Sequence, residues 1–252
     1  MSGVSPPPLG ASWLGRVDYL EAWRLQEAVA TRVRAGGDER LLFLEHDPVY
    51  TVGRRGTTEH LLAGPGELRR AGVSVYRVDR GGDITYHGPG QLVGYPVVRL
   101  GDAPDPVRYV RAIESALMDA LASYGVAART ERGKTGVWVD LPGTSLAAKI
   151  AAIGVRVSRG VTTHGFALNV RTDLAAFERM IPCGFAHEVA SLELLGVMTD
   201  VRGVADRAAA ALAERLGRRL LWSGVEPARD DEIAADAPVR SAVDLVRDAV
   251  PA

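Results

Sequence analysis

The segment of residues 80–96 constrains the fold more than any other part of the sequence. It reads RGGDITYHGPGQLVGYP, so glycines and prolines alternate with charged, amide, phenol and imidazole side chains. Apolar, strand-like runs at residues 73–78 and 92–98 flank or overlap it. One interpretation is a long turn whose glycines serve only geometry. Such a turn needs no dense set of hydrogen-bonding side chains, so we predict the lining of a binding site.

The apolar periodicity of the remaining chain predicts helices and strands in an irregular alternation. Helical spacing predicts helices at residues 19–35, 107–124 and from 199 or 200 to 220, with a shorter one at 174–180. Apolar runs predict further strands at 41–44, 136–139, 149–157 and 161–170, and residues 49–66 are expected to form a loop. Several strands are joined by tight turns. We therefore expect an α/β fold of the α+β type, a mixed β-sheet flanked by helices.

One folded domain is expected between two peripheral segments. Residues 1–10 include three consecutive prolines and are expected to form an extended, mobile leader. Residues 225–252 are rich in alanine and aspartate and weakly patterned, which predicts a peripheral tail. Residues 11–224 are then expected to form the single folded domain, which is long enough to bury a substantial core.

The composition argues against several classes of protein. The formal net charge is −1 and the charged residues are spread along the chain, which does not suggest a nucleic-acid partner. No apolar run approaches the roughly 18–20 residues of a membrane span, and residues 1–10 lack a signal-peptide pattern. The single cysteine, Cys183, rules out an intramolecular disulfide. We expect a cytoplasmic protein without a membrane partner.

Cys183 and Lys149 are the strongest candidates for covalent chemistry. A lone cysteine is often an inert buried side chain, but Pro182 and Gly184 place this one in a turn after the predicted short helix. A cysteine nucleophile must be a thiolate, which needs a nearby base or cation. Lys149 begins an otherwise apolar strand and can serve as that base, although a strand-end lysine in water is the alternative.

The histidines and glycine motifs support no metal or phosphate site. His87 and His164 each precede a glycine and are either structural or partners of the cysteine. No pair of His or Cys residues has metal-ligand spacing, so we expect neither a metal nor a cofactor. The residues 133–135 imitate the end of a phosphate-binding loop, but the preceding residues do not fit it, and there is no GxSxG motif.

Five ordered segments of the sequence resemble the lipoyl(octanoyl) transferases of the biotin/lipoate protein ligase superfamily. They are residues 80–96, 135–138 (TGVW), 149–155 (KIAAIGV), 164–170 (HGFALNV) and 182–184 (PCG). The resemblance covers about residues 41–195 and implies the mixed-sheet fold of the superfamily's catalytic domains. Two departures, Ala190 before Ser191-Leu192 and Ala148 before the lysine, concern secondary contacts only.

The resemblance implies an acyltransferase that performs the first step of protein lipoylation. The octanoyl group would move from octanoyl-acyl carrier protein to a lysine on lipoyl domains of 2-oxoacid dehydrogenase complexes or on the glycine cleavage H protein. Cys183 would carry the group as a thioester, and Lys149 would activate the thiol. The implied acyl-binding residues are Arg80, Gly81, Gly82, Asp83, Ile84, Thr85, Tyr86, His87, Ala152, Ile153, Gly154, Gly165, Phe166 and Ala167. Acyl transfer also needs donors to the carbonyl oxygen, for which the N–H of Gly184 and the His164 ring are candidates in supporting roles.

Three other functions compete with this interpretation. An ATP-dependent lipoate–protein ligase of the same fold would adenylate free lipoate and would not need Cys183. An amidotransferase of the superfamily would use a cysteine but would take the acyl group from another lipoyl domain. A non-enzymatic module would bind an acyl carrier without transferring the group, and Lys149 would then be dispensable.

Overall fold

The structure is a computed structural model that describes residues 5–144, 146–181 and 188–222. Its helices are α1 (Tyr19–Arg34), α2 (Pro65–Ala71), α3 (Pro106–Ala122) and α4 (Val201–Arg215), with 3-10 turns η1 (Thr58–His60) and η2 (Leu174–Arg179). Its strands are β1 (Pro8–Val17), β2 (Glu39–His46), β3 (Val49–Val52), β4 (Ser74–Arg77), β5 (Ile84–His87), β6 (Gln91–Val97), β7 (Arg129–Glu131), β8 (Lys134–Asp140), β9 (Ala147–Ser158), β10 (Val161–Asn169), β11 (Glu188–Val189) and β12 (Arg219–Trp222).

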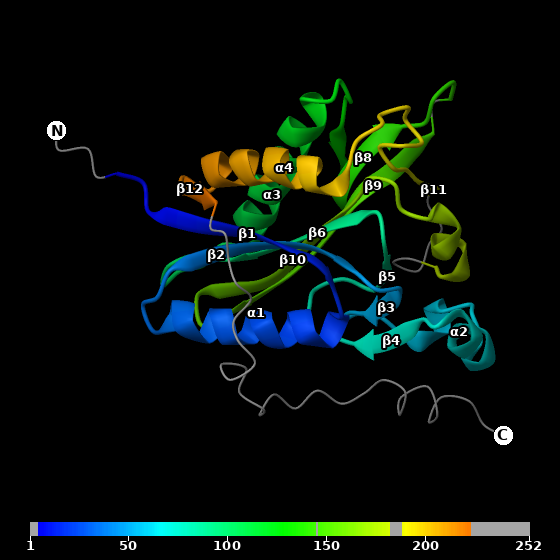
Figure 1. Ribbon diagram of the computed structural model, residues 1–252, viewed down its shortest axis with the longest axis horizontal. Coiled ribbons are helices and arrows are strands. Elements are labelled where there is room, and N and C mark those ends of the chain that lie inside the picture. Colours follow the sequence, from blue (N-terminus) through cyan, green and yellow to red (C-terminus); the bar gives the residue numbers. More distant parts are fainter. Residues whose placement is uncertain (1–4, 145, 182–187, 223–252) are drawn as a thin grey trace.

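A large mixed sheet forms the centre of the molecule (Figure 1). Its strand order is β12-β1-β2-β6-β10-β9-β8-β7, and β11 pairs with β9 outside this path. The pairs β1–β12, β1–β2 and β9–β11 are parallel, whereas the others are antiparallel. Helix α1 covers one face, and α3 and α4 pack together on the other (Figure 1). The predicted mixed sheet flanked by helices is confirmed.

The amphipathic helices form where side chains satisfy their first N–H groups. Asp18 caps α1 by accepting hydrogen bonds from the N–H groups of Leu20 and Glu21, and Asp105 caps α3 through the N–H of Arg108. The apolar face of α1 packs on β2 and β6, whereas α3 and α4 bury a second core with the opposite sheet face. The sheet is therefore held rigidly between two hydrophobic layers.

A second, three-stranded sheet holds the glycine-rich segment beside the large sheet. Its order is β4-β3-β5, with β3 antiparallel to β5 and parallel to β4. The loop that leads into β5 is tied to the large sheet, because the N–H of Gly81 donates to the carbonyl of Val155 on β9 at 3.0 Å. The two sheets thus meet along this loop.

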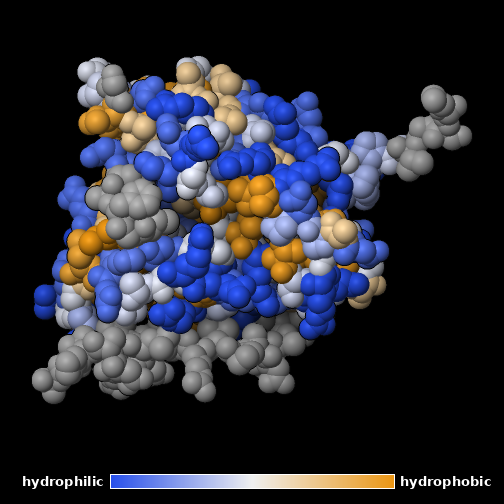
Figure 2. Space-filling view, turned by 180° about the vertical axis from the view of Figure 1, so that it is seen from behind, coloured by the Kyte–Doolittle hydropathy of each residue, from blue (hydrophilic) through white to orange (hydrophobic). Residues whose placement is uncertain are grey.

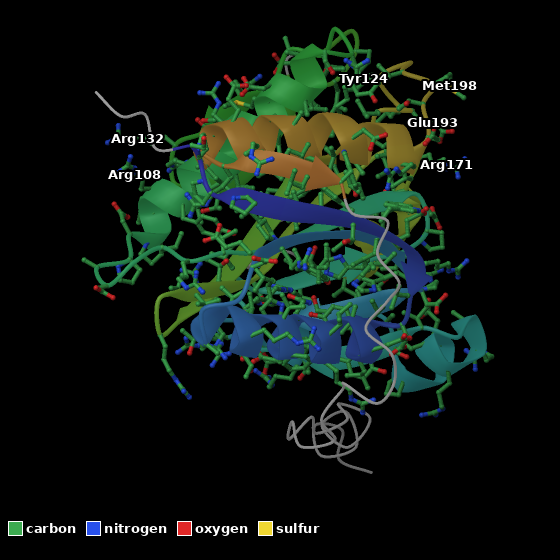
Figure 3. All side chains as sticks on the ribbon, turned by 60° about the vertical axis from the view of Figure 1, so that its left-hand side comes forward. Arg108, Tyr124, Arg132, Arg171, Glu193 and Met198 are labelled. Atoms are coloured by element: carbon green, nitrogen blue, oxygen red, sulfur yellow. The ribbon has the colours of Figure 1, made fainter. Side chains whose placement is uncertain are left out.

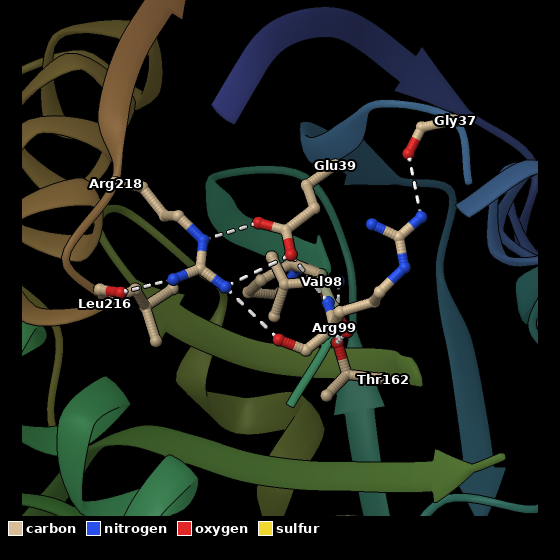
Figure 4. Close-up of polar contacts among 8 residues, drawn as sticks. Gly37, Glu39, Val98, Arg99, Thr162, Leu216 and Arg218 are labelled. Carbon is tan, nitrogen blue, oxygen red and sulfur yellow. Dashed lines mark hydrogen bonds and ion pairs between the residues drawn. The ribbon is translucent and has the colours of Figure 1, made fainter. Parts of the chain in front are cut away.

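The segment just before β12 is tied to β2 and to the residues that follow β6. Arg218 donates from Nε to Glu39 Oε2 at 2.6 Å and from Nη2 to the carbonyl of Arg99 at 3.2 Å (Figure 4). Glu39 also accepts from the backbone N–H of Arg99 at 2.8 Å. This network joins the residue before β12 to the first residue of β2 and to the end of β6.

Several predicted boundaries are wrong. Strand β1 begins at Pro8, inside the predicted leader 1–10. Residues 49–66, expected to be a loop, contain β3, η1 and the start of α2. The last helix ends at Arg215 rather than 220, because Gly217 adopts φ 65° and the N–H of Arg218 bonds back to Ala213, a Schellman ending. The predicted tail 225–252 lies outside the described residues. No described helix has the length and apolar character to cross a membrane.

Candidate active site

A cavity of about 530 Å³ lies where the loop before β5 meets β9 and β10. The start of β8, residues of η2 and Val189 of β11 complete its wall. On the face shown in Figure 2, hydrophobic side chains are visible in a hollow near the centre, and hydrophilic side chains form much of the surrounding surface. The combination of an apolar interior with polar groups at defined positions is typical of a small-molecule site.

Most of the predicted site residues lie on the wall of this cavity. The members that line it are Arg80, Gly81, Gly82, Asp83, Ile84, Thr85, His87, Lys149, Ala152, Ile153, Gly154, His164, Gly165, Phe166 and Ala167. Tyr86 does not line it, because its ring packs against Tyr50 and Phe177 at centroid distances of 5.3 and 5.6 Å. Cys183 and Gly184 lie outside the described residues. The structure therefore brings the glycine-rich loop to the same cavity as the β9–β10 hairpin, which lies far from it in sequence.

Arg80 and Asp83 anchor the loop in addition to lining the cavity. Arg80 Nη2 donates to the carbonyl oxygen and to Oγ1 of Thr51, at 2.6 and 2.8 Å. Asp83 Oδ1 accepts from the N–H of Ile84 at 2.7 Å, and its Oδ2 lies 2.6 Å from His60 Nδ1. Both side chains are nearly buried. Arg80 thus ties the glycine-rich loop to β3, and Asp83 ties it to η1.

A chain of amide and imidazole groups connects the cavity to the strand β11 region. His87 Nδ1 donates to Gln91 Oε1 at 2.8 Å, and Gln91 Nε2 donates to Asn169 Oδ1 at 3.0 Å. Asn169 in turn donates to the carbonyl of Ala190 at 3.0 Å. Burial, with the nearby His46 and Arg80, lowers the pKa of His87 well below its usual value, so this imidazole is neutral.

His164 is held in a strained and buried position between α1 and the cavity. Its φ is +57°, and its N–H donates to Gln26 Oε1 of α1 at 2.8 Å. Its Nε2 donates to Asp79 Oδ1 at 2.7 Å, but burial outweighs the carboxylate and lowers its pKa. For Asp79, burial raises the pKa, yet His164 and Arg156 outweigh it and the net shift is downward. His164 therefore acts as a neutral, oriented ring.

His46, Tyr19 and Tyr95 form an aromatic end of the site that the sequence analysis did not single out. Tyr19 and Tyr95 line the cavity. His46 is fully buried behind them, with Nε2 2.7 Å from the Tyr95 hydroxyl and Nδ1 2.8 Å from the carbonyl of Val17. Burial lowers the pKa of His46 to about 4. The only sequence signal for this group is a histidine two residues after the apolar run at 41–44.

Lys149 lies on β9, opposite Trp138 of β8. Its Nζ is 4.8 Å from the centroid of the Trp138 ring. Its carbonyl accepts from the N–H of Ala190, which joins β9 to the chain after β11. Among the described residues, no group of three or more His, Cys, Asp or Glu side chains is arranged to hold a metal ion. An amine on the wall of a partly apolar cavity can accept a proton from a group bound or placed beside it.

Comparison with known proteins identifies the family. The chain matches the lipoyl protein ligase A/B catalytic domain over residues 18–213. An octanoyltransferase of Solibacter usitatus is 49% identical over 196 residues, which cover 77% of this chain and 86% of the relative. An octanoyltransferase of Mycolicibacterium smegmatis is 47% identical over 215 residues, 84% of this chain and 91% of the relative.

The solved structures agree on the fold. A bipartite lipoate protein ligase from Thermoplasma acidophilum superposes with a TM-score of 0.69 at 18% identity, covering 97% of this chain and 92% of that one. Lipoate-protein ligase A bound with ATP gives a TM-score of 0.72 at 19% identity, with 95% and 93% covered. The chain belongs to the lipoyl protein ligase A/B catalytic domain family. It is an acyltransferase, since the relatives that match it at 49% and 47% identity are octanoyltransferases.

Proposed function

We propose that the chain transfers an octanoyl group from octanoyl-acyl carrier protein to a lysine of lipoyl domains, as the first step of protein lipoylation. The octanoyltransferase relatives support the acyl group, and the resemblance of residues 182–184 supports Cys183 as its carrier. The observation that carries the proposal is the position of Lys149 on the wall of a cavity formed by the three predicted acyl-binding segments.

The reaction proceeds in two acyl transfers at one sulfur. Lys149 accepts the proton of the Cys183 thiol, and the thiolate attacks the carbonyl carbon of the donor thioester. The bond from that carbon to the donor sulfur breaks, and the departing thiolate takes the proton from Lys149. The amine of the acceptor lysine then attacks the Cys183 thioester, which releases the Cys183 thiolate and leaves an amide. The proton lost by the amine returns to the Lys149–Cys183 pair, so no cofactor is consumed.

The negative charge that develops on the carbonyl oxygen needs nearby donors. Backbone N–H groups of Cys183 and Gly184 are the proposed donors, because a glycine beside the nucleophile lets the peptide approach the oxygen closely. His164 is proposed to support the site from the cavity wall. Its neutral ring and fixed orientation suit it to positioning the substrate, since it cannot easily gain a second proton.

The apolar part of the cavity suits a medium-length acyl chain. Ile84, Ala152, Ile153, Phe166 and Ala167 supply the aliphatic and aromatic surface on which the chain would lie. Burial of each methylene contributes roughly 0.8 kcal/mol, so a chain of several methylenes gains enough to be distinguished by length. The cavity of about 530 Å³ also leaves space for part of the donor's thiol arm.

The proposed donor and acceptor are both carrier domains. Arginines at and near the edge of the cavity would contact an acidic donor. Arg55 lines the cavity, Arg54 precedes it in the chain, and both are exposed. Arg132, next to the lining residue Gly133, and Arg108 of α3 project outward in Figure 3. Arg159, also proposed as a contact, lies in the turn between β9 and β10 and is exposed. Lipoyl domains of 2-oxoacid dehydrogenase complexes and the glycine cleavage H protein are the proposed acceptors, in the cytoplasm.

The proposal is tested by intact-protein mass spectrometry after brief mixing with octanoyl-acyl carrier protein in the absence of ATP. We expect one octanoyl adduct that hydroxylamine removes and that is absent from Cys183→Ser. The adduct should form slowly in Lys149→Ala at neutral pH. Transfer that requires ATP and free acid, and that persists in Cys183→Ser, would instead identify a ligase in which the cysteine is structural.

A further inference from the structure

Both lysines of the chain stand against the same tryptophan. The sequence contains two lysines, Lys134 and Lys149, and 28 arginines. Lys134 Nζ lies 5.3 Å and Lys149 Nζ 4.8 Å from the centroid of the Trp138 ring, and both lysines line the cavity. All the other Lys or Arg positions of the sequence hold arginine. The placement of both primary amines on one indole therefore points to a chemical requirement for lysine there.

The register between β8 and β9 determines where the Trp138 indole lies. A register shift between Val137 and Trp138 sets Trp138 directly opposite Lys149, so both side chains lie on one face of the sheet. Trp138 is 1% exposed, and its Nε1 donates to the carbonyl of Lys134 at 3.3 Å. Both lysines bring their Nζ close to this ring, and both residues line the cavity.

Gly136 and Glu114 hold that part of β8 in place. Gly136 has φ +125°, and a Cβ there would lie 2.6 Å from the carbonyl oxygen of Ala151 and 3.4 Å from Lys149 Cε. Its N–H donates to Glu114 Oε1 of α3 at 3.0 Å. Glu114 is completely buried, and its other oxygen pairs with Arg111. Helix α3 thus holds in place β8, the strand that pairs with β9 beside Lys149.

We propose that Lys134 is a positioning residue for Lys149, which it influences through the shared Trp138 ring. The inference rests on the proposed function, in which Lys149 accepts the thiol proton. The indole attracts each ammonium and so holds both amines near the ring. The two nitrogens are no further apart than their two ring distances together, so a charge on Lys134 opposes a charge on Lys149. Lys149 then keeps more of its unprotonated form, which is the form that accepts the proton.

A compact charge suits this role better than a delocalised one. The ammonium of lysine concentrates its charge at one nitrogen, whereas the guanidinium of arginine is planar and stacks flat on aromatic rings. Other charges also bear on Lys149. Glu188 lies on β11, whose register pairs it with Ala148, and it acts in the opposite sense to Lys134. The remaining charged or titratable side chains of the cavity wall, among the residues that the structure describes, are Tyr19, Arg55, Arg80, Asp83, His87, Tyr95 and His164.

The chain allows a direct test, because a protein labelled with ¹³C at the lysine ε carbon carries only two lysine side chains. We would follow both NMR signals with pH in the wild type, in Lys134→Met and in Lys134→Arg. Loss of the Lys134 charge should raise the titration midpoint of Lys149 by about half a unit to one unit at low ionic strength. Lys134→Arg should restore only part of the wild-type effect, because its charge is delocalised over the guanidinium. Added salt should reduce the difference between wild type and Lys134→Met.

Loss of the Lys134 charge should also slow octanoyl loading, because less Lys149 is then in its unprotonated form. Octanoyl loading of Lys134→Met at neutral pH should be roughly threefold to tenfold slower than wild type, and the difference should shrink at pH 9. Trp138→Phe, which keeps an aromatic face, should retain the dependence on Lys134, whereas Trp138→Leu should lose it. Thermal melting of each variant separates loss of folding from loss of the effect.

Failure of this inference is distinguishable from failure of the proposed function. If wild type loads octanoyl on Cys183 but Lys134→Met leaves both the Lys149 midpoint and the loading rate unchanged, the pairing is overturned and the function stands. If the midpoint shifts as expected but Cys183→Ser loads and transfers normally, the electrostatic coupling stands and the proposed role of Lys149 in thiol activation is overturned.

Discussion

Replacement of Gly154 by alanine tests whether the contact between β9 and the glycine-rich loop sets the shape of the cavity. Gly154 lies on β9 where the loop crosses it. A Cβ there would lie 2.8 Å from the carbonyl oxygen of Gly81 and 3.1 Å from Arg80 Cδ. Neither neighbour can move easily, because Gly81 is bonded to Val155 and the guanidinium of Arg80 to Thr51. The loop must therefore shift away from the large sheet.

The size of the effect follows from that contact. Ordinary van der Waals contact begins at 3.4 Å, so backbone atoms must move by several tenths of an ångström. Overpacking of this kind costs roughly 1–3 kcal/mol. For a domain of this size, each kcal/mol lowers Tm by roughly 2–4 °C, so we expect Gly154→Ala to melt about 2–12 °C below wild type. If 1–2 kcal/mol of acyl-chain binding is lost as well, kcat/KM for octanoyl loading falls by about fivefold to thirtyfold.

Thermal melting and the initial rate of octanoyl loading would be measured side by side with Gly66→Ala. Gly66 lies in α2, and the nearest atom to its added Cβ would be Arg70 Nη1 at 3.6 Å, the end of a flexible side chain. That control should therefore load octanoyl like wild type, and it should melt at or slightly above the wild-type Tm because alanine favours the helix. A Gly154→Ala protein with the Tm and loading rate of the control would refute the claim that this close approach shapes the cavity.

Three further predictions concern the base, the acyl chain and the buried histidines. Lys149→Ala should slow octanoyl loading more at neutral pH than at pH 9, where the thiol ionises without help; equal slowing at both pH values would argue against activation. A hexanoyl donor lacks two methylenes and should show roughly tenfold to twentyfold lower kcat/KM than octanoyl, unless the cavity does not hold the chain. Burial lowers the pKa of His46 from its usual 6.5 to about 4, so the unfolded chain binds this proton first as the pH falls. The free energy of unfolding should therefore drop between about pH 6.5 and 4, by up to about 3 kcal/mol from this ring, and urea denaturation of His46→Gln should show a shallower dependence.

The sequence predicted best those elements whose own pattern determines them. The helix α3 and the hairpin of β9 and β10 carry strong periodicity and clear stops, and they appear close to the predicted positions. Strand β1 was missed because its partners supply its environment. It lies between β2 and β12. Pro8 of β1 pairs with Arg219 of β12, which comes far later in the chain. No local signal reports such a pairing.

The site shows the same division between local and long-range information. The glycine-rich motif predicted that the segment of residues 80–96 lines a binding site, because its composition marks a loop with directed polar groups. Residues 80–85, His87, Gln91 and Tyr95 do line the cavity. The anchoring of Arg80 on Thr51 could not be predicted, because it depends on the pairing of β3 with β5. The burial of His46 behind Tyr95 likewise depends on the adjacency of β2 and β6. Such contacts form only when the strands pair, so no local sequence pattern predicts them.

The pairing of Lys134 and Lys149 on Trp138 also determines how this protein can be handled. Reagents that couple dyes, biotin or solid supports to proteins usually react with lysine amines spread over the surface. Here the side-chain amines are confined to two residues that line the cavity, of which Lys134 is the more exposed. Amine coupling would therefore modify either the chain terminus or the site itself, and labels intended to leave the site intact belong on other chemistry.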